Sequence, residues 1–182
     1  QGANVTCPTC RDEAGTRVRA LDSRRGVPVT DDQEPIRFNS KTPGFSWLSN
    51  FHPCRITDLQ GAVWLSAEHL YQAAKTLDPE SRERIRWERT AAGARRLGRD
   101  VPVRPDWDAR KIEVMRRILR LKFAQHPNLA RRLLATGTKP LIHLSPWDLY
   151  WGATTESVGD NHLGQLLMDL RDEIAERERT EP

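Results

Sequence analysis

The hydrophobic pattern of this chain changes at Ser66, and this change limits most strongly what the chain can fold into. Before it, short apolar segments separated by turn residues predict strands near Ile36–Phe38, Cys54–Thr57 and Val63–Leu65. After it, apolar residues recur at helical spacing almost to the C-terminal end. The sequence therefore predicts a small β-sheet and several helices.

The first of these helices is predicted over Ser66–Lys75. Ser66 is a good N-cap, because its hydroxyl can accept a hydrogen bond from a free N–H of the first turn. The apolar side of the helix consists of Ala67, Leu70, Ala74 and Leu77. At roughly 100° per residue, four other residues cluster about a third of a turn away. These are Glu68, Tyr71, Gln72 and Lys75.

Further helical patterns cover residues 80–98, 108–124, 128–136 and 161–177. The first of these is rich in arginine, with Gly93 and Gly98 as candidate breaks, so it predicts one or two helices. Between the last two patterns, residues 141–150 are irregular or strand-like.

The domain organisation follows from these patterns. Residues 36–178 are expected to form a compact, mainly helical α+β domain with a small β-sheet. Residues 1–35 show no sustained period and are interpreted as an N-terminal extension, and residues 179–182 as a charged tail.

The composition is that of a soluble globular protein, with 37% apolar and 30% charged residues in a chain of 182. No apolar run approaches the roughly 18 residues that a membrane span requires, and no charged-then-apolar leader is visible. Three cysteines argue against a disulfide scaffold and favour a reducing compartment. We therefore expect a cytoplasmic protein with no membrane partner; the sequence leaves its oligomeric state open.

The polar face of the first helix contains two groups suited to catalysis. Glu68 lies in the first turn, where the helix dipole favours a carboxylate that can act as a base or stabilise positive charge. Lys75 lies two turns further along the same face, and a partly desolvated lysine can act as a nucleophile. The alternative is an ordinary solvated helix face.

Two other positions are candidates for the same site. Asp148–Gly152 places aromatic residues beside a glycine, which suits a flat ring and a close backbone approach, although a core tryptophan beside a turn gives the same pattern. Lys122 falls within the apolar arc of the predicted helix 108–124, so its ammonium must either reach the helix end or point into a polar cavity.

Basic residues and cysteines give weaker signals. Eight arginines fall between Arg82 and Arg104, within a net charge of +4. This stretch favours a phosphate-bearing partner, or it is a solvated helix face. Cys7 and Cys10 are spaced like half of a zinc site, or are an ordinary pair of thiols. The histidines show no spacing typical of a catalytic metal, so we predict none.

Taken together, these residues resemble the NADAR family, also called YbiA-like, from about Phe38 to Ile174. The matching pieces follow the family's order and similar spacing. They are Ser49-Asn50-Phe51, Ser66-Ala67-Glu68-His69, Tyr71-Gln72-Ala73-Ala74-Lys75, Gly98-Arg99, Arg104-Pro105-Asp106-Trp107, Lys111, Met115, Lys122-Phe123, Gln125-His126-Pro127, Leu134-Ala135-Thr136-Gly137, Asp148, Trp151-Gly152, Asn161 and Leu163-Gly164.

The resemblance implies an N-glycosidase, a hydrolase that needs no metal or other cofactor. Family members cleave the bond between ribose C1 and an exocyclic amine. The expected substrate is a phosphorylated ribosyl small molecule, namely a ribosylamino-pyrimidine phosphate of the riboflavin pathway, or ADP-ribosylated guanine in nucleic acid. The implied fold is a compact, mainly helical α+β domain.

Combined with the residue chemistry, the resemblance gives a candidate site. The candidate catalytic residues are Glu68, Lys75, Lys122 and Asp148. The candidate substrate-binding residues are Asn50, Phe51, Tyr71, Gln72, Arg99, Arg104, Trp107, Trp151, Gly152 and Asn161. Lys75, or else Lys122, is expected to form a Schiff base with C1, and the alternative is direct attack by water with Glu68 or Asp148 as the base.

One position departs from the family pattern, because His143 stands where many members have an acidic residue. Two other classes of protein remain open. One is a non-hydrolytic module that binds ADP-ribose or NAD in the same pocket. The other is a nucleic-acid-binding protein that uses the arginine-rich stretch.

Overall fold

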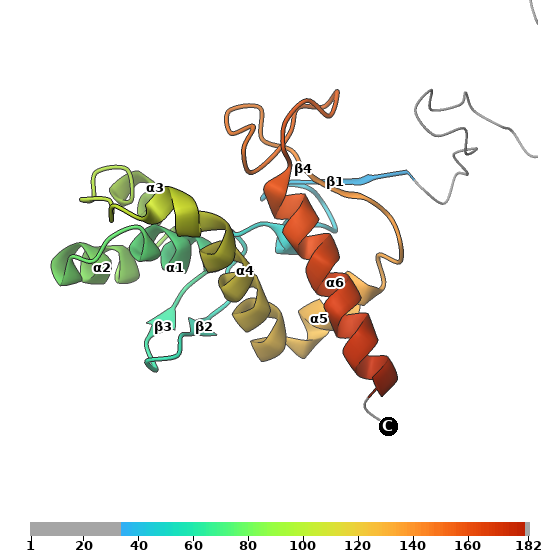
Figure 1. Cartoon of the computed structure of the whole chain (residues 1–182), viewed down its shortest axis with the longest axis horizontal. Coiled ribbons are helices and arrows are strands. Elements are labelled where there is room, and N and C mark those ends of the chain that lie inside the picture. Colours follow the sequence, from blue (N-terminus) through green and yellow to red (C-terminus); the bar gives the residue numbers. More distant parts are fainter. Residues whose placement is uncertain (1–33, 181–182) are drawn as a thin grey trace, which may run out of the picture. The chain divides into compact units, whose positions relative to one another are not determined.

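The computed structural model describes residues 34–180 (Figure 1), and residues 35–180 belong to one compact unit. The predicted N-terminal extension, with its Cys7 and Cys10 pair, lies outside the described residues apart from its last two positions, Glu34 and Pro35. In the described part of the chain, no helix is long and apolar enough to cross a membrane.

The described residues form a mainly helical α+β domain, which confirms the predicted fold class. The helices are α1 (Ala67–Ala74), α2 (Pro79–Arg86), α3 (Ala91–Leu97), α4 (Trp107–Gln125), α5 (Pro127–Leu134) and α6 (His162–Thr180). The strands are β1 (Ile36–Phe38), β2 (Ile56–Thr57), β3 (Val63–Trp64) and β4 (Leu141–His143), and a short 3-10 helix, η2, covers Ser46–Leu48.

Within residues 34–180 the β-structure is small, as predicted, and its strands pair as two two-stranded sheets. β2 and β3 pair antiparallel as a hairpin, while β1 pairs in parallel with β4, with Ile36 opposite Leu141 and Phe38 opposite His143. β1, the first element of the described chain, thus pairs with a strand about 100 residues later in the sequence. That strand, β4, directly precedes the loop that leads into α6 (Figure 1). This pairing brings the chain after β1 next to the chain after β4.

Side-chain caps set the starts of the first three helices. Ser66 caps α1 as predicted, its hydroxyl accepting from the N–H of His69, and Asp78 caps α2 by accepting from Ser81 N–H at 2.8 Å. Thr90 caps α3 by accepting from the N–H of Gly93 at 2.9 Å. The arginine-rich stretch therefore breaks before Thr90, and Gly93 lies inside α3.

Helix α1 packs against α2, α3 and α4, and it is buried on its polar side as well as its apolar side. Glu68, His69 and Gln72 are as buried as the leucine and alanines of the same helix. Leu77, expected on its apolar side, lies beyond the helix end and is 66% exposed. Buried polar groups are costly unless they find partners, so the surroundings of these side chains decide what the helix does.

Candidate active site

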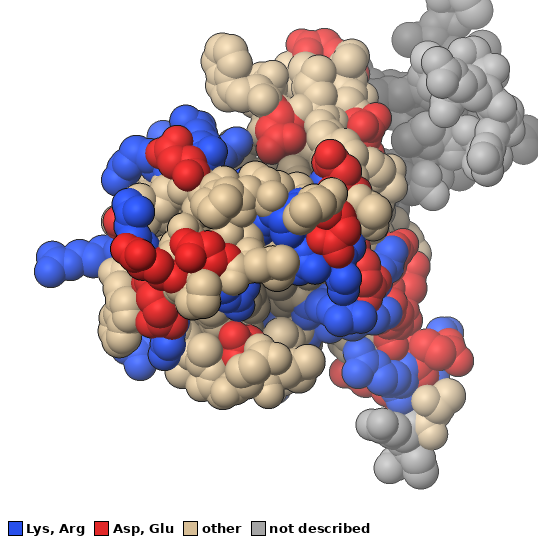
Figure 2. All heavy atoms as spheres, turned by 60° about the vertical axis from the view of Figure 1, so that its left-hand side comes forward, with Lys and Arg blue, Asp and Glu red and all other residues tan. Residues whose placement is uncertain are grey.

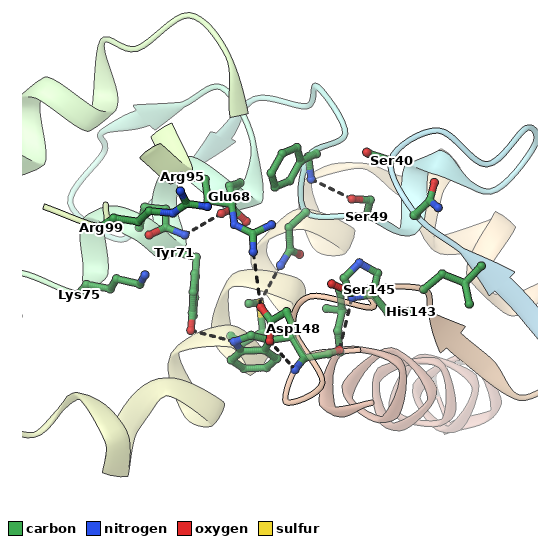
Figure 3. Close-up of a pocket in the computed structure, with 18 residues that line it drawn as sticks. Ser40, Ser49, Glu68, Tyr71, Lys75, Arg95, Arg99, His143, Ser145 and Asp148 are labelled. Carbon is green, nitrogen blue, oxygen red and sulfur yellow. Dashed lines mark hydrogen bonds and ion pairs between the residues drawn. The ribbon is translucent and has the colours of Figure 1, made fainter. Parts of the chain in front are cut away.

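A cavity of about 340 Å³ opens beside α1 (Figure 3). Its wall is formed by the segments that follow β1 and η2, by helices α1 and α4, by the end of α3, by the loop that follows β4, and by the start of α6. The lining residues are Asn39, Ser40, Ser49, Asn50, Phe51, Glu68, Tyr71, Gln72, Lys75, Arg95, Arg99, Met115, His143, Leu144, Ser145, Asp148, Trp151 and Leu163. The cavity therefore joins segments from both ends of the domain.

Glu68 is the most deeply buried acid of this wall. Its Oε1 accepts a hydrogen bond from Gln72 Nε2 at 2.7 Å, one helical turn further on. Burial raises the pKa of Glu68, although Gln72 and the nearby cations Arg95 and Lys75 act in the opposite direction. Glu68 is thus a carboxyl group that can hold a proton closer to neutral pH than an ordinary glutamate.

Lys75, the C-cap of α1, has the opposite shift. Burial lowers its pKa, and the charges of Arg95 and Arg99 lower it further, while Glu68 and Asp148 pull it back up. Its Nζ lies 5.7 Å from the centre of the Tyr71 ring. More of this lysine is therefore present as the free, nucleophilic amine than at a solvated site.

Asp148 sits in the loop after β4 and is held from two sides. Its Oδ1 accepts from the backbone N–H of Trp151 at 3.1 Å, and its Oδ2 lies 3.7 Å from a guanidinium nitrogen of Arg95. In Figure 3, Asp148 lies between the charged residues of α1 and α3 and the polar residues around Ser145. The aspartate thereby links the two sides of the cavity.

An aromatic wall connects α1 to the same loop. Trp151 Nε1 donates a hydrogen bond to the Tyr71 hydroxyl at 3.1 Å, and the two rings meet edge to face with centroids 5.5 Å apart. Burial raises the pKa of Tyr71 well above its ordinary value, so the phenol keeps its proton. Because the hydroxyl accepts from Trp151, that proton remains available to a ligand.

The amide of Asn50 and the imidazole of His143 complete the opposite wall. Asn50 Nδ2 donates to Met115 Sδ at 3.3 Å, and its buried Oδ1 has no partner among residues 34–180. His143, the last residue of β4, stacks on Phe38 with centroids 5.4 Å apart, and its Nδ1 lies 3.4 Å from the carbonyl oxygen of Trp151. Each group therefore keeps one polar atom without a partner among residues 34–180: Oδ1 of Asn50 and Nε2 of His143.

Lys122, the second candidate nucleophile, does not line this cavity. It is fully buried, and its Nζ donates to the backbone carbonyls of Trp47 at 2.7 Å and Ser49 at 3.0 Å. Burial lowers its pKa to about 8. The structure thus places Lys122 behind η2, where its ammonium ties down the chain that leads to Asn50.

Arg104 and Trp107 also lie outside the cavity lining. Arg104 pairs with Asp106, its Nη2 donating to Oδ2 at 3.0 Å. Trp107 packs behind Tyr71 with ring centroids 5.2 Å apart. The geometry therefore gives Trp107 a supporting contact and leaves Arg104 engaged elsewhere.

Gly152 and Asn161 support the cavity without lining it. A Cβ at Gly152 would lie 2.6 Å from the carbonyl oxygen of His143 and 2.7 Å from Ser145 Cβ, so only glycine fits there without a shift. Asn161 Oδ1 accepts from the N–H of His143 at 2.9 Å, and its Nδ2 donates to the carbonyl of Leu141 at 2.9 Å. Both residues fix the position of β4.

The arginine-rich stretch divides between two uses. Arg95 and Arg99 line the cavity, whereas Arg86 pairs with Glu83 at 3.1 Å. Figure 2 shows Lys and Arg interspersed with Asp and Glu on the face that it presents, with no continuous basic surface. Arg95 and Arg99 at the cavity are therefore the candidates for binding an anion.

Nine of the site residues predicted from the sequence line this cavity. They are Asn50, Phe51, Glu68, Tyr71, Gln72, Lys75, Arg99, Asp148 and Trp151. Sequence reasoning missed Arg95, although its spacing of four residues from Arg99 in the basic stretch was a signal. It also missed Ser40, Ser49 and Ser145, which come from loops without a period. Within residues 34–180, no group of three or more His, Cys, Asp or Glu side chains could hold a metal ion.

The fold and the cavity define a small α+β domain in which a buried carboxyl group, a lysine of lowered pKa and two arginines line one cavity. The family model of the NADAR domain matches residues 37–175, so the chain belongs to the NADAR family, as the resemblance predicted.

Curated relatives agree with this assignment. The chain is 41% identical over 142 residues to N-glycosidase YbiA of Escherichia coli K12, covering 77% of this chain and 88% of that protein. It is also 41% identical over 146 residues to the riboflavin biosynthesis protein VVA0006 of Vibrio vulnificus YJ016, covering 79% of this chain but only 40% of the relative. The names include the reaction class that the resemblance implied, that of an N-glycosyl hydrolase.

A solved structure supports the fold. The NMR structure of E. coli YbiA superposes with a TM-score of 0.75 at 40% identity, covering 85% of this chain and 91% of that one. The observed arrangement of helices and short strands is therefore that of a protein of the same family.

Proposed function

We propose that this protein is an N-glycosidase that hydrolyses the bond between C1 of a phosphorylated ribose and an exocyclic amine. The observation that carries the proposal is the pairing of Glu68 and Lys75 in one cavity with opposite pKa shifts. Hydrolysis of a glycosylamine requires an acid and a nucleophile, and these shifts make Glu68 a readier proton donor and Lys75 a readier free amine than at solvated sites. The names of the curated relatives support the same reaction.

The phosphate of the sugar is assigned to Arg95 and Arg99, the two guanidinium groups that line the cavity. Guanidinium groups bind phosphate through charge-assisted, often bidentate hydrogen bonds. Arg95 keeps Asp148 close at 3.7 Å, so its position is set before a ligand arrives. Binding of the phosphate would fix C1 within the same cavity as Lys75 and Glu68.

The proposed chemistry passes through a Schiff base. Opening of the ribose ring breaks the C1–O4′ bond and leaves an imine between C1 and the leaving amine. The free amine of Lys75 adds to C1, and the exocyclic nitrogen departs with a proton, which leaves a C1=N bond to Lys75. Water then adds to C1 and releases the lysine, so the net products are the free sugar and the free amine.

Glu68 is assigned the proton transfers. In its protonated form it can donate to O4′ as the ring opens, or to the departing nitrogen, and as a carboxylate it can take a proton from the attacking water. Gln72 Nε2, which donates to Glu68 at 2.7 Å, fixes the orientation of the carboxyl group. The alternative route is direct attack by water on C1, with Glu68 or Asp148 as the base and no covalent adduct.

Lys122 is assigned a structural role, since its ammonium is bonded to two backbone carbonyls away from the cavity. Borohydride reduction during turnover separates the routes. The Schiff-base route predicts a reduced adduct on Lys75 that is absent from Lys75→Ala and retained in Lys139→Ala, a lysine outside the cavity. Turnover by Lys75→Ala at the wild-type rate would eliminate this route.

The leaving group is tested with two substrates. The purified chain is offered a ribosylamino-pyrimidine 5-phosphate and, separately, an oligonucleotide with ADP-ribosylated guanine, and release of ribose 5-phosphate or ADP-ribose is followed by mass spectrometry. We expect cleavage of the small ribosyl phosphate, the class that fits a single local anion site. If Glu68→Gln and the wild type bind product equally and neither cleaves either substrate, the protein is a binding module.

A further inference from the structure

The polar groups of the cavity are divided by charge. Glu68, Lys75, Arg95 and Arg99 come from α1 and the region of α3, and they lie on one side of Asp148 in Figure 3. The other side carries Ser40, Ser49, Ser145 and His143, which Figure 3 shows together. Asn50 and the apolar side chains of Met115, Leu144 and Leu163 also line the cavity.

His143 presents a hydrogen-bond acceptor to this neutral side. Its Nδ1 lies 3.4 Å from the carbonyl oxygen of Trp151, and because a carbonyl can only accept, this contact favours the tautomer with the proton on Nδ1. Burial lowers the pKa of His143 and so favours the neutral ring; Arg95 acts in the same direction, while the Trp151 carbonyl and Asp148 oppose it. Nε2, which has no partner among residues 34–180, is then an acceptor.

Asn50 supplies a second acceptor. Asn50 is only 7% exposed, and its Oδ1 has no hydrogen-bond partner among the described residues. Burying a carbonyl oxygen without a partner is energetically costly. That cost is removed if a ligand places an N–H group against Asn50 Oδ1.

The two sides of the cavity match the two parts of the proposed substrate. A sugar phosphate is anionic and requires the cations of the charged side. The leaving amine is a neutral, flat heterocycle with amino and ring N–H donors. Such a ring binds favourably where neutral acceptors and apolar side chains surround it. Phosphate would be disfavoured beside two acceptors, because neither can donate to it.

We propose that His143 and Asn50 form the leaving-group subsite, where His143 Nε2 and Asn50 Oδ1 accept hydrogen bonds from the N–H groups of an aminated heterocycle. The assignment rests on the proposed function for the identity of the ligand. It makes His143 a residue that determines which amine departs.

Direct binding of the two product halves tests the subsite without requiring turnover. Calorimetry measures the affinity of the wild type, His143→Leu and His143→Gln for 5,6-diaminouracil and for ribose 5-phosphate. Leucine removes the acceptor, so the affinity for diaminouracil should fall about tenfold, the value of one hydrogen bond. Glutamine retains a carbonyl acceptor and should lose less than about threefold, and ribose 5-phosphate should bind all three proteins alike.

Two controls make the result specific. 1,3-Dimethyluracil, which has no N–H group, should bind the wild type and His143→Leu equally. Arg99→Leu should show the reverse pattern, weakening ribose 5-phosphate and leaving diaminouracil unchanged. If His143→Leu loses affinity equally for both ligands, His143 only supports the cavity and the subsite is overturned. The subsite is also overturned if the affinity of His143→Leu for diaminouracil is unchanged, or if the wild type does not bind diaminouracil. A wild type that binds diaminouracil but cleaves no ribosylamine would refute the proposed function alone.

Discussion

Trp151 donates its indole N–H to the hydroxyl of Tyr71 at 3.1 Å, and this bond joins the loop after β4 to the helix that carries Glu68 and Lys75. The two residues lie in distant parts of the chain, and their rings also meet edge to face. The contact therefore couples the two segments that supply most of the cavity's ionisable groups.

A double-mutant cycle measures this coupling. Tyr71→Phe and Trp151→Phe each remove the hydrogen bond, and each should lower the free energy of unfolding by about 1 kcal/mol. Because the second substitution finds the bond already gone, the double variant should lose less than the sum of the single losses. Denaturant titration of the four proteins gives the coupling energy. Strict additivity would show that the bond contributes nothing.

The pH dependence of turnover should report the lowered pKa of Lys75. Only the free amine attacks C1, so kcat/KM should rise with pH and level off below 10.5, the ordinary pKa of lysine. Arg95 lowers that pKa, so Arg95→Gln should move the rising limb to higher pH. Arg96→Gln, an exposed charge that is absent from the cavity lining, is the matched control and should leave the limb in place. A rising limb at the same pH in the wild type and Arg95→Gln would contradict the assignment.

The buried Lys122 should give the protein an unusual dependence of stability on pH. Its pKa is lowered in the folded state to about 8, against an ordinary value of 10.5. Between these values the unfolded chain binds more protons than the folded one, so the free energy of unfolding rises with pH across this window, by up to about 3 kcal/mol. Below pH 8 both states are protonated, and this contribution is constant.

Denaturant titrations between pH 7 and 10.5 check this prediction for the wild type and Lys122→Met. The variant should be less stable at every pH, because the carbonyls of Trp47 and Ser49 lose their donor. It should also lose the rise with pH. If the two proteins rise in parallel, Lys122 does not titrate in this window.

Gly152→Ala should disturb the cavity from behind. The added Cβ would lie 2.6 Å from the His143 carbonyl oxygen, so the chain around His143 must move. We expect a loss of about 1–3 kcal/mol in stability, together with weaker binding of the leaving heterocycle. Gly61→Asn is the control, since a Cβ there meets nothing within 4 Å and asparagine tolerates its φ of +83°. A fully stable Gly152→Ala protein would refute the packing argument.

The parts of the fold that the sequence predicted well are those set by local interactions. The start of α1 follows from the Ser66 hydroxyl and the residues that directly succeed it. The pairing of β1 with β4 is different, because short strands far apart in the chain carry no pattern that names their partner. The sequence therefore predicted a small amount of β-structure but not which strands pair.

The site divides in the same way. Glu68, Tyr71, Gln72 and Lys75 were found together because one helix spaces them on one face. The Lys122 ammonium was expected either to reach the helix end or to point into a polar cavity. It is buried and bonded to two backbone carbonyls instead, which helical spacing cannot show. Loop residues such as Ser145 enter the cavity only through tertiary packing.

The side chain of Asn161 has a further consequence for the behaviour of the chain in solution. β4 pairs with β1 on one edge, and its other edge would present free N–H and C=O groups to any passing strand. Asn161, in a left-handed conformation with φ of 51°, bonds to the Leu141 carbonyl and the His143 N–H on that edge, and Ala153 N–H occupies the His143 carbonyl at 2.8 Å. The Asn161 side chain thus occupies backbone groups that a further strand would need for pairing, which disfavours association of two chains through this edge.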